Sequence, residues 1–312
     1  MKVSRLLLSG LIAIVFGAAC GNGSKPQRTF PGDRLLVSTR TSEEGAAEKG
    51  RWLAWMESDA PNLSPPRSAT RVLVREAGSG DPIRVNPAGT FAETGDISGG
   101  RLYFQLIRRN RSSIATFDLA TRRIAVLPRF VNQVRWAWRP SVSGRWLLFG
   151  EIDYAAGRYA IVAADLRAHA RRVVAAVAGH AAYAAPGQVN GEWATWTACP
   201  GNKCNVHRLN LRTGVEASAP GASVVGLLRY GPSVAPDGTV YFGQSTTVCG
   251  ASKILRWSRS NSLETVATLP DGTGFQYSYV SAAPGRTRLL YDAVACDKHA
   301  LSDIYALAVD GK

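Results

Sequence analysis

Two pairs of acidic residues have the spacing of groups that act together. Glu57 and Asp59 lie two residues apart, and Glu151 and Asp153 repeat that spacing after a similar aromatic residue. In a β-strand, residues i and i+2 point to the same face. Each pair could therefore hold a cation or bind an arginine, while solvated strand ends would show the same spacing. We carry these four residues as the predicted ligand rim, with both interpretations open.

Familiar catalytic motifs are missing from the chain. It contains no G-x-S-x-G elbow, no H-E-x-x-H and no P-loop, so we predict no catalytic residue, metal or cofactor. The alternative is a hydrolase or lyase acting on glycans or small esters, in which the ligand rim, His180 or His299 supplies an acid, a base or metal ligands. Convergence of the rim and a histidine on one pocket would favour that enzyme.

A repeated β-rich unit must position these residues. Each repeat contains a segment that begins with glycine and closes on an aromatic residue, and the steps between the closing residues are 49, 45, 47, 46 and 49. A period of about 47 residues with turns rich in Gly, Pro and Asp is typical of one four-stranded propeller blade. We therefore predict an all-β fold, a six-bladed β-propeller of four-stranded antiparallel blades. The closing residues are Trp55, Phe104, Phe149, Trp196, Phe242 and Tyr291.

The third repeat illustrates the expected strands. We place the innermost strand at 133–138, the second at 145–152, the third at 158–166 and the outermost at 171–177, with a turn at 139–144 between the first two. Large aromatic residues recur on the second strands, where they are expected to fill the gaps between blades. They are Trp52, Trp55, Trp146, Trp193 and Trp196.

The last repeat ends after its third strand, at 303–309, and would expose an unpaired edge. Residues 34–40 precede the first repeat and have the pattern of the other outermost strands. We predict that this N-terminal strand closes the ring.

Cysteine spacing suggests two disulfides, because an even count in an oxidising compartment favours pairing. Cys199 and Cys204 enclose a turn-forming Pro-Gly-Asn-Lys segment, which predicts a bond between them. Cys249 and Cys296 are 47 residues apart, one repeat, and would join adjacent blades. A zinc site is the weaker alternative, since one C-x₄-C pair lacks a second close pair of ligands.

Two segments resemble the repeats of TolB-like propellers, which typically read Ser-Pro-Asp-Gly, an apolar strand, then Asp-Ile-Tyr and a closing Asp-Gly. They are Val234-Ala-Pro-Asp-Gly-Thr-Val-Tyr-Phe242 and Ser302-Asp-Ile-Tyr-Ala-Leu-Ala-Val-Asp-Gly311. The resemblance covers residues 30–312 as a repeat architecture and is close in the fifth and sixth repeats. It implies a rigid ring whose channel mouth receives a peptide or a small ligand, and it carries over no catalytic residue.

The N-terminus has the layout of an export signal. Lys2 and Arg5 precede an apolar stretch, and the 14 residues from Leu6 to Ala19 are fewer than the roughly 20 that a membrane-spanning helix needs. The segment 17–20 resembles the lipobox of bacterial lipoproteins, although Gly17 stands where Leu is usual. This resemblance implies a signal peptide at 1–19 and lipidation of Cys20. The residues that follow predict a flexible tether at 20–29, and the repeats place the propeller at 30–312. Ordinary cleavage, which leaves Cys20 as a free thiol, is the alternative.

Charge does not indicate a nucleic-acid partner. The chain has a formal net charge of +14, but its 37 Lys and Arg residues are scattered singly along the expected strands. We expect an exported protein, anchored by lipid to the bacterial cell membrane and facing outside the cytoplasm. Its propeller is expected to act as a non-enzymatic binding or scaffolding module for an envelope protein or a small ligand at the channel mouth.

Overall fold

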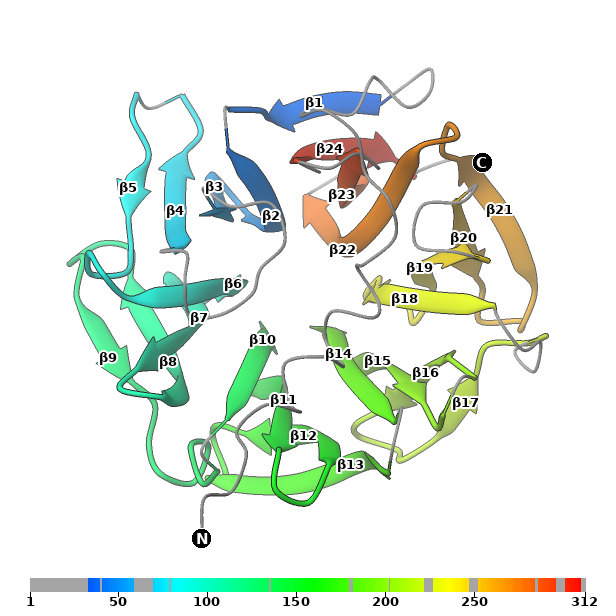
Figure 1. The fold of residues 1–312 in the computed structure, drawn as a ribbon, viewed down its shortest axis with the longest axis horizontal. Helices are drawn as coiled ribbons and strands as arrows, with labels where there is room; N and C mark the ends of the chain where they lie inside the picture. The colour runs from blue at the N-terminus through cyan, green and yellow to red at the C-terminus, as the bar shows by residue number, and fades with distance from the viewer. Residues whose placement is uncertain are drawn as a thin grey trace, which may run out of the picture.

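Six four-stranded antiparallel sheets stand around a central channel like the blades of a propeller (Figure 1). The fold class predicted from the repeats is thus confirmed. The computed structural model describes residues 33–39, 41–58, 70–78, 80–134, 136–179, 182–201, 203–221, 227–246, 252–283, 286–295 and 301–309. Within these ranges, no helix has the length and apolarity needed to cross a bilayer.

The first three blades follow one another along the chain, each running from its innermost to its outermost strand. Blade one contains β2 (Ser42–Lys49), β3 (Trp52–Ser58), β4 (Thr70–Glu76) and β5 (Ile83–Arg84). Blade two contains β6 (Phe91–Ser98), β7 (Arg101–Arg108), β8 (Arg111–Asp118) and β9 (Ile124–Val126). Blade three contains β10 (Ala137–Ser143), β11 (Trp146–Asp153), β12 (Arg158–Asp165) and β13 (Ala170–Ala178).

The other three blades keep the same order until the last strand. Blade four contains β14 (Tyr183–Asn190), β15 (Trp193–Cys199), β16 (Asn205–Asn210) and β17 (Glu216–Ser218). Blade five contains β18 (Leu228–Val234), β19 (Val240–Ser245), β20 (Lys253–Trp257) and β21 (Leu263–Thr268). Blade six contains β22 (Thr273–Ala283), β23 (Arg286–Ala295), β24 (Ser302–Ala308) and, outermost, β1 (Asp33–Val37).

Strand β1 closes the ring, as the sequence predicts. It pairs antiparallel with β24, and its register shifts between Leu35 and Val37. Val37 is only 6% exposed and packs in a cluster with Trp55 of blade one and Ile304 of blade six. The first strand of the described chain therefore covers the edge that the last blade would otherwise expose.

The hydrophobic core is divided among the gaps between blades. Among the described residues there are six apolar clusters, and each draws its side chains from two neighbouring blades. Trp55 and Trp196 are almost fully buried in two of these clusters. Trp146 packs against the cluster that contains Trp196, while Trp52 and Trp193 pack against two further clusters. The second-strand tryptophans thus fill inter-blade gaps, as their positions predict.

The innermost strand of blade three lies further along the chain than predicted. Strand β10 spans Ala137–Ser143, so the segment expected as a turn is part of this strand. Its pairing with β11 shifts between Trp138 and Ser141, and Arg139 has a left-handed φ of 47°. A β-bulge accommodates the left-handed conformation, and Pro140 is tolerated because β10 is the edge strand of its sheet. The prediction of a turn was wrong because Arg-Pro-Ser has the composition of one.

We expect the substitution Val37→Ala to lower the free energy of unfolding by about 2 kcal/mol, because it leaves a cavity in the cluster that joins the first and last blades. Leu35→Ala on the same strand is the matched control, since Leu35 is 41% exposed, and surface truncations usually change stability by less than about 0.5 kcal/mol. Guanidinium unfolding measures both variants. Equal losses would contradict the observed register of β1 on β24.

Candidate functional site

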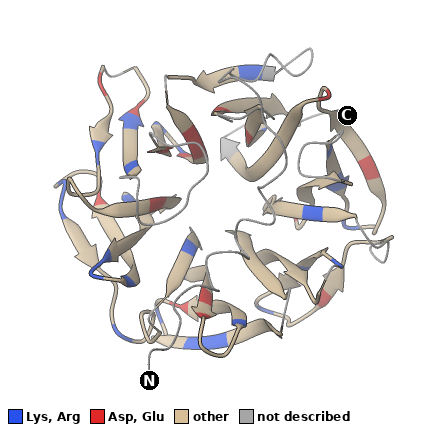
Figure 2. Ribbon diagram, in the orientation of Figure 1, with Lys and Arg blue, Asp and Glu red and all other residues tan. Residues whose placement is uncertain are grey.

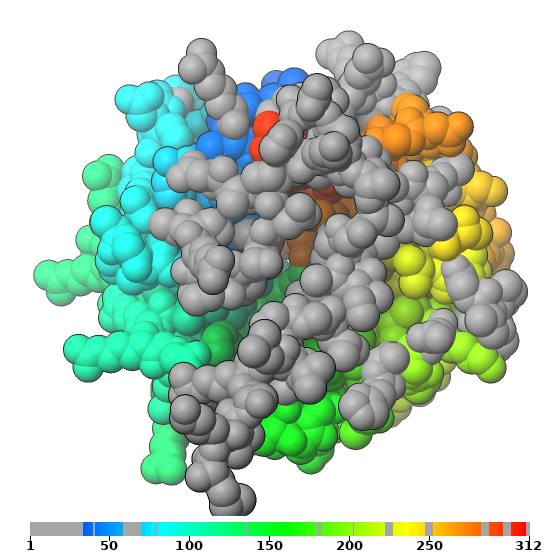
Figure 3. Space-filling model, viewed as in Figure 1, coloured from blue at the N-terminus to red at the C-terminus, as the bar shows by residue number. Residues whose placement is uncertain are grey.

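Every innermost strand contains an irregularity at the same level of the channel wall. Pairing with the second strand shifts at Glu44/Ala47, Thr94/Asp96, Trp138/Ser141, Pro186/Val189, Tyr230/Ser233 and Phe275/Ser278. Bulges of this kind bend a strand and change where its side chains point. Residues from all six bulged segments line one cavity of about 100 Å³ in the channel. Figure 3 shows the molecule in space-filling form from the same side as Figure 1.

Glycine permits neighbouring bulges to touch. A Cβ on Gly187 would lie 2.3 Å from the carbonyl oxygen of Pro232, and one on Gly95 would lie 2.4 Å from that of Pro140. Both distances are far below van der Waals contact. Only glycine therefore allows the backbone of one blade to approach the bulge of the next so closely.

Among the described residues, one arginine interacts electrostatically with three buried carboxylates. Arg139 on β10 acts electrostatically on Glu44 of β2, Glu93 of β6 and Asp292 of β23. Its guanidinium carbon lies 4.0 Å from the ring centroid of Tyr277, which is a cation–π arrangement. Glu93, Arg139 and Tyr277 all line the cavity, so three blades contribute charged or aromatic groups to it.

Burial makes these carboxylates hard to ionise. Desolvation is the main cause of a rise in the pKa of Glu44 to about 7; the Ser42 hydroxyl and Arg139 oppose this rise, while Glu93 contributes to it. Burial also raises the pKa of Glu93, again against Arg139, and raises that of Asp292 well above its ordinary value. The channel thus holds groups whose charge state changes with pH and with the arrival of a ligand.

Glu44 is only partly satisfied by the protein. Its Oε1 accepts hydrogen bonds from Ser42 Oγ at 3.1 Å and from Ser302 Oγ at 3.4 Å, but among the described residues its Oε2 has no partner. The residue is 6% exposed. Thr94 Oγ1, on the cavity wall, is buried and equally unpartnered in the described structure. Buried polar atoms of this kind are uncommon and often mark a functional site.

Below these groups, Asp96 joins three blades. Its carboxylate on β6 accepts hydrogen bonds from Tyr279 Oη of blade six at 2.8 Å, and from Ser141 Oγ at 2.8 Å and Val142 N at 3.0 Å of blade three. Burial raises the pKa of Asp96, and these donors oppose that rise. Blade one lies between blades two and six, so the hydrogen bond from Tyr279 to Asp96 links two blades that are not neighbours and holds their innermost strands at a fixed separation.

Gln188 makes the corresponding link on the other side of the ring. Its Oε1 accepts from Val234 N of blade five at 3.2 Å and from Val280 N of blade six at 3.0 Å, and its Nε2 donates to Val280 O at 3.0 Å. The side-chain amide of Gln188 thus links blades four, five and six and has a structural role. Together with Asp96 it holds the innermost strands at fixed separations.

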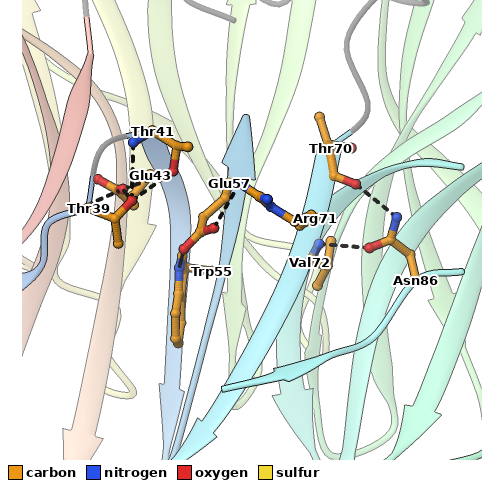
Figure 4. A network of polar contacts seen from close by, with 9 residues as sticks. All are labelled: Thr39, Thr41, Glu43, Trp55, Glu57, Thr70, Arg71, Val72 and Asn86. Atoms are coloured by element: carbon orange, nitrogen blue, oxygen red, sulfur yellow. Dashed lines mark hydrogen bonds and ion pairs between the residues drawn. The ribbon is translucent and has the colours of Figure 1, made fainter. Parts of the chain in front are cut away.

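The predicted rim residue Glu57 is held within blade one. It is 8% exposed, accepts a hydrogen bond from Trp55 Nε1 at 3.1 Å and pairs with Arg71 of β4 at 3.4 Å (Figure 4). Figure 4 also shows Glu43 held by the hydroxyls of Thr39 and Thr41 beside β2. Both carboxylates thus already bind other side chains of the protein.

Of the other three predicted rim residues, two are bound within blade three and one lies outside the described residues. Glu151 of blade three forms a bidentate ion pair with Arg171 of β13, both contacts being 2.7 Å. Asp153 is exposed and caps a turn through the amides of Ala155 and Ala156. Asp59 lies outside the described residues. Neither Glu57 nor Glu151 lines the channel cavity, and a ligand role for the rim stays a prediction.

The structure joins Cys199 and Cys204 by a disulfide between the end of β15 and the start of β16. Cys20, Cys249 and Cys296 lie outside the described residues, as do His180 and His299. Within the part of the chain that is described, no three His, Cys, Asp or Glu side chains are grouped to hold a metal ion.

One described group has the composition of a hydrolase triad but not its geometry. On blade four, His207 Nδ1 lies 3.0 Å from Ser218 Oγ and 3.4 Å from Glu216 Oε1. A triad needs the serine and the acid on different ring nitrogens, so that one accepts a proton while the other is held. The ring also stacks flat on Trp196, and burial lowers the pKa of His207. The group therefore lacks the arrangement for proton relay.

Comparison with known proteins supports the fold. No protein-family model matches the chain, and no curated protein sequence matches it. Solved structures do. A putative TolB from Agrobacterium tumefaciens matches with a TM-score of 0.57 and 12% identity, covering 88% of this chain and 94% of that one. TolB from Acinetobacter baumannii matches with a TM-score of 0.52 and 12% identity, covering 83% of this chain and 64% of that one.

A peptidase is similar to the same degree. A puromycin-hydrolyzing peptidase from Mycobacterium tuberculosis matches with a TM-score of 0.52 and 12% identity, covering 88% of this chain and 56% of that one. The chain thus spans less than two thirds of the Acinetobacter TolB and of this peptidase. At such identities the likeness shows a shared six-bladed β-propeller fold and does not extend to an activity.

The raised pKa of Glu44 predicts how stability depends on pH. A carboxyl whose pKa is raised by folding contributes stability below its unfolded value of 4.5 that is lost as pH rises through about 7. We expect the free energy of unfolding to fall between pH 5 and pH 8, with up to about 3 kcal/mol of the fall due to this residue. Denaturant titration across that range measures the effect.

Glu44→Gln keeps an acceptor for Ser42 and Ser302 and removes the ionisation, so its unfolding free energy should depend less steeply on pH than that of the parent. The control is Glu264→Gln, because Glu264 is exposed on the outermost strand β21. If the Glu44 variant retains the full pH dependence of the parent, then ionisation of this carboxyl is not its source.

Proposed function

We propose that this chain is a non-enzymatic binding module whose ligand occupies the central channel. The observation that carries the proposal is the cavity lined by Arg139, Glu93 and Tyr277 from three different blades, together with the buried Oγ1 of Thr94 on its wall, which has no hydrogen-bond partner among the described residues. The TolB structures of similar fold support a binding role. A cavity with a few convergent polar and aromatic groups is the usual form of a ligand site.

The construction of the ring suits binding by a preformed surface. Asp96 and Gln188 connect blades across the channel, and the bulges fix the side chains that face the cavity. A site that is ordered before its ligand arrives loses less conformational entropy on binding. The same rigidity serves a scaffold that presents one partner to another.

The hydrolase or lyase remains the alternative, and no observation among the described residues favours it. Of the two histidines in these ranges, His207 is held on blade four, and His169 lies beside Phe130 with ring centroids 5.3 Å apart. Neither lines the channel cavity. We therefore place binding ahead of catalysis.

The proposal also includes where in the cell the protein works. The features at residues 1–20 support export and lipidation of Cys20, with residues 20–29 as the tether and an envelope protein or a small ligand as the partner. Stable anchoring needs several acyl chains, since one chain binds a bilayer only marginally. In this arrangement the lipid determines where the propeller works, and the channel determines what it binds.

A pull-down from envelope extract tests the channel. Residues 21–312 serve as bait beside two variants, one with Tyr277→Ala and Glu93→Gln in the channel, the other with the four rim carboxylates replaced by alanine. We expect the parent and the rim variant to retain the same ligand and the channel variant to lose at least tenfold of it, because only that variant removes a ring and a charge from the cavity. Loss in the rim variant alone would refute the channel and restore the rim.

Fractionation of cells tests the anchor. Replacing Cys20 by serine in the full chain removes the thiol that carries the lipid, so the protein should move from the membrane fraction to the soluble exported fraction. Cys204→Ser is a control that leaves the N-terminus intact and should remain with the membrane. Continued membrane retention of the Cys20 variant would contradict lipid anchoring.

A further inference from the structure

The hairpin between β7 and β8 places three arginines on four consecutive residues of blade two. Arg108, Arg109 and Arg111 are all exposed, and Asn110 lies between the last two. Figure 2 shows basic segments distributed around the ring, several of them on blade two. The hairpin thus concentrates positive charge at one place on the outer part of the propeller.

This arrangement of arginines is unfavourable for the hairpin itself. Arg108 and Arg111 are directly opposite each other in the ladder, where like charges repel and destabilise a strand pair. Arg109 and Asn110 have φ angles of 47° and 61°, which is the left-handed pair of a type I′ turn. Such turns favour Asn and Gly, because the Cβ of other residues is crowded in this conformation. A neutral residue at 108 and an asparagine at 109 would form the same turn at lower cost.

A groove of about 420 Å³ opens beside the hairpin. Its lining comes from the hairpin, through Arg109, Asn110 and Arg111, and from the connection between blades two and three, through Gln133 and Val134. Four of these five side chains can donate N–H groups, and among the described residues no carboxylate lines the groove. A volume of this size is common for small-molecule sites. The groove shares no residue with the channel cavity.

The two parts of the groove are held together by hydrogen bonds. Arg111 donates to the carbonyl oxygen of Asn132 at 3.0 Å, which ties the hairpin to the connecting segment. The Asn132 side chain is buried, accepts from Ile114 N at 2.8 Å and donates to Leu127 O at 2.9 Å. A guanidinium has five N–H donors, so the bond to Asn132 uses only part of what Arg111 offers. The groove is therefore formed before a ligand arrives.

This set of donors suits an oxyanion with more than one negative charge. Guanidinium groups donate pairs of N–H groups to phosphate oxygens, and these charge-assisted bonds are stronger than neutral ones. A phosphomonoester carries about two negative charges near neutral pH, which can balance both members of the Arg108 and Arg111 pair. A monocarboxylate supplies only one charge, and a cation would be repelled. The groove chemistry therefore favours a phosphomonoester.

We propose that the groove is a second binding site, outside the channel, that takes a phosphomonoester group. The phosphate contacts Arg109 and Arg111 and offsets the repulsion between Arg111 and Arg108. A soluble phosphate ester and the head group of a lipid that ends in a phosphomonoester share this chemistry. The inference goes beyond the binding function proposed for the channel, and each site can fail its own test without the other.

Calorimetric titration of residues 21–312, which contain the whole described propeller, tests the site with glycerol 3-phosphate. We expect a dissociation constant on the order of 1 mM or lower, and binding of acetate that is weaker on the order of tenfold. Sedimentation with vesicles of phosphatidylcholine, with and without phosphatidic acid, is the second arm. Retention only by vesicles that contain phosphatidic acid would identify a lipid as an acceptable source of the phosphate, and binding of glycerol 3-phosphate alone would restrict the site to soluble esters.

The double variant Arg109→Asn and Arg111→Gln should weaken binding of the phosphate probe on the order of tenfold. The matched control is Lys203→Gln with Lys253→Gln, which removes the same charge from exposed residues between the second and third strands of blades four and five. Circular dichroism checks both folds. Equal losses in the two double variants, acetate binding as tight as that of glycerol 3-phosphate, or binding of neither phosphate source would overturn the proposal.

Arg109→Asn alone separates the ligand role of this residue from a structural one. Asparagine adopts the left-handed conformation more readily than arginine, so the midpoint of guanidinium unfolding should rise while affinity for glycerol 3-phosphate falls. A lower midpoint with unchanged affinity would overturn the proposal, because Arg109 would then serve the hairpin and not a ligand.

Discussion

Packing between neighbouring blades is the interaction on which the rest of this structure depends. A four-stranded sheet of this size cannot bury its apolar faces alone, and here each face is covered by the next blade through one of the six clusters. The requirement is circular, because the last blade must cover the first. Pairing of β1 with β24 and the cluster around Val37 meet it at the point where the chain would otherwise leave a gap.

Ring closure also explains why polar groups can lie in the channel. The apolar clusters fill the gaps between blades, and the innermost strands surround the central channel. There, a bulge in each innermost strand interrupts its regular pairing with the second strand. Asp96 and Gln188 use that space to link non-adjacent blades, and burial raises the pKa of Asp96, Glu44 and Glu93. Asp96 has donors from two other blades, whereas Glu44 Oε2 has no hydrogen-bond partner among the described residues. A buried carboxyl group that is costly to ionise lowers the stability of the fold, and such groups are typically retained at functional sites.

The parts of the fold that depend on periodic packing could be predicted from the sequence. Trp55 and Trp196 recur at the repeat length because the gap between blades recurs, and β1 could be found because the last repeat lacks a strand. The candidate site could not be found in this way. Arg139 and Pro140 have the composition of a turn, and the bulge that holds them leaves no apolar pattern. A usable signal was the glycine 9 to 11 residues before the closing aromatic in four repeats, at Gly45, Gly95, Gly187 and Gly231.

Spacing along a strand predicts a shared face but not the partner that the next strand supplies. Glu57 and Glu151 do occupy equivalent positions, yet Arg71 and Arg171 of their own blades pair with them. The same limit applies to net charge. Counter-ions at physiological ionic strength screen the positive exterior beyond about 8 Å, so a ligand that reaches the channel responds mainly to the groups around it. The charge of the channel wall therefore follows from the side chains that the bulged strands bring to the cavity, such as Arg139 and Glu93, and not from the net charge of the chain.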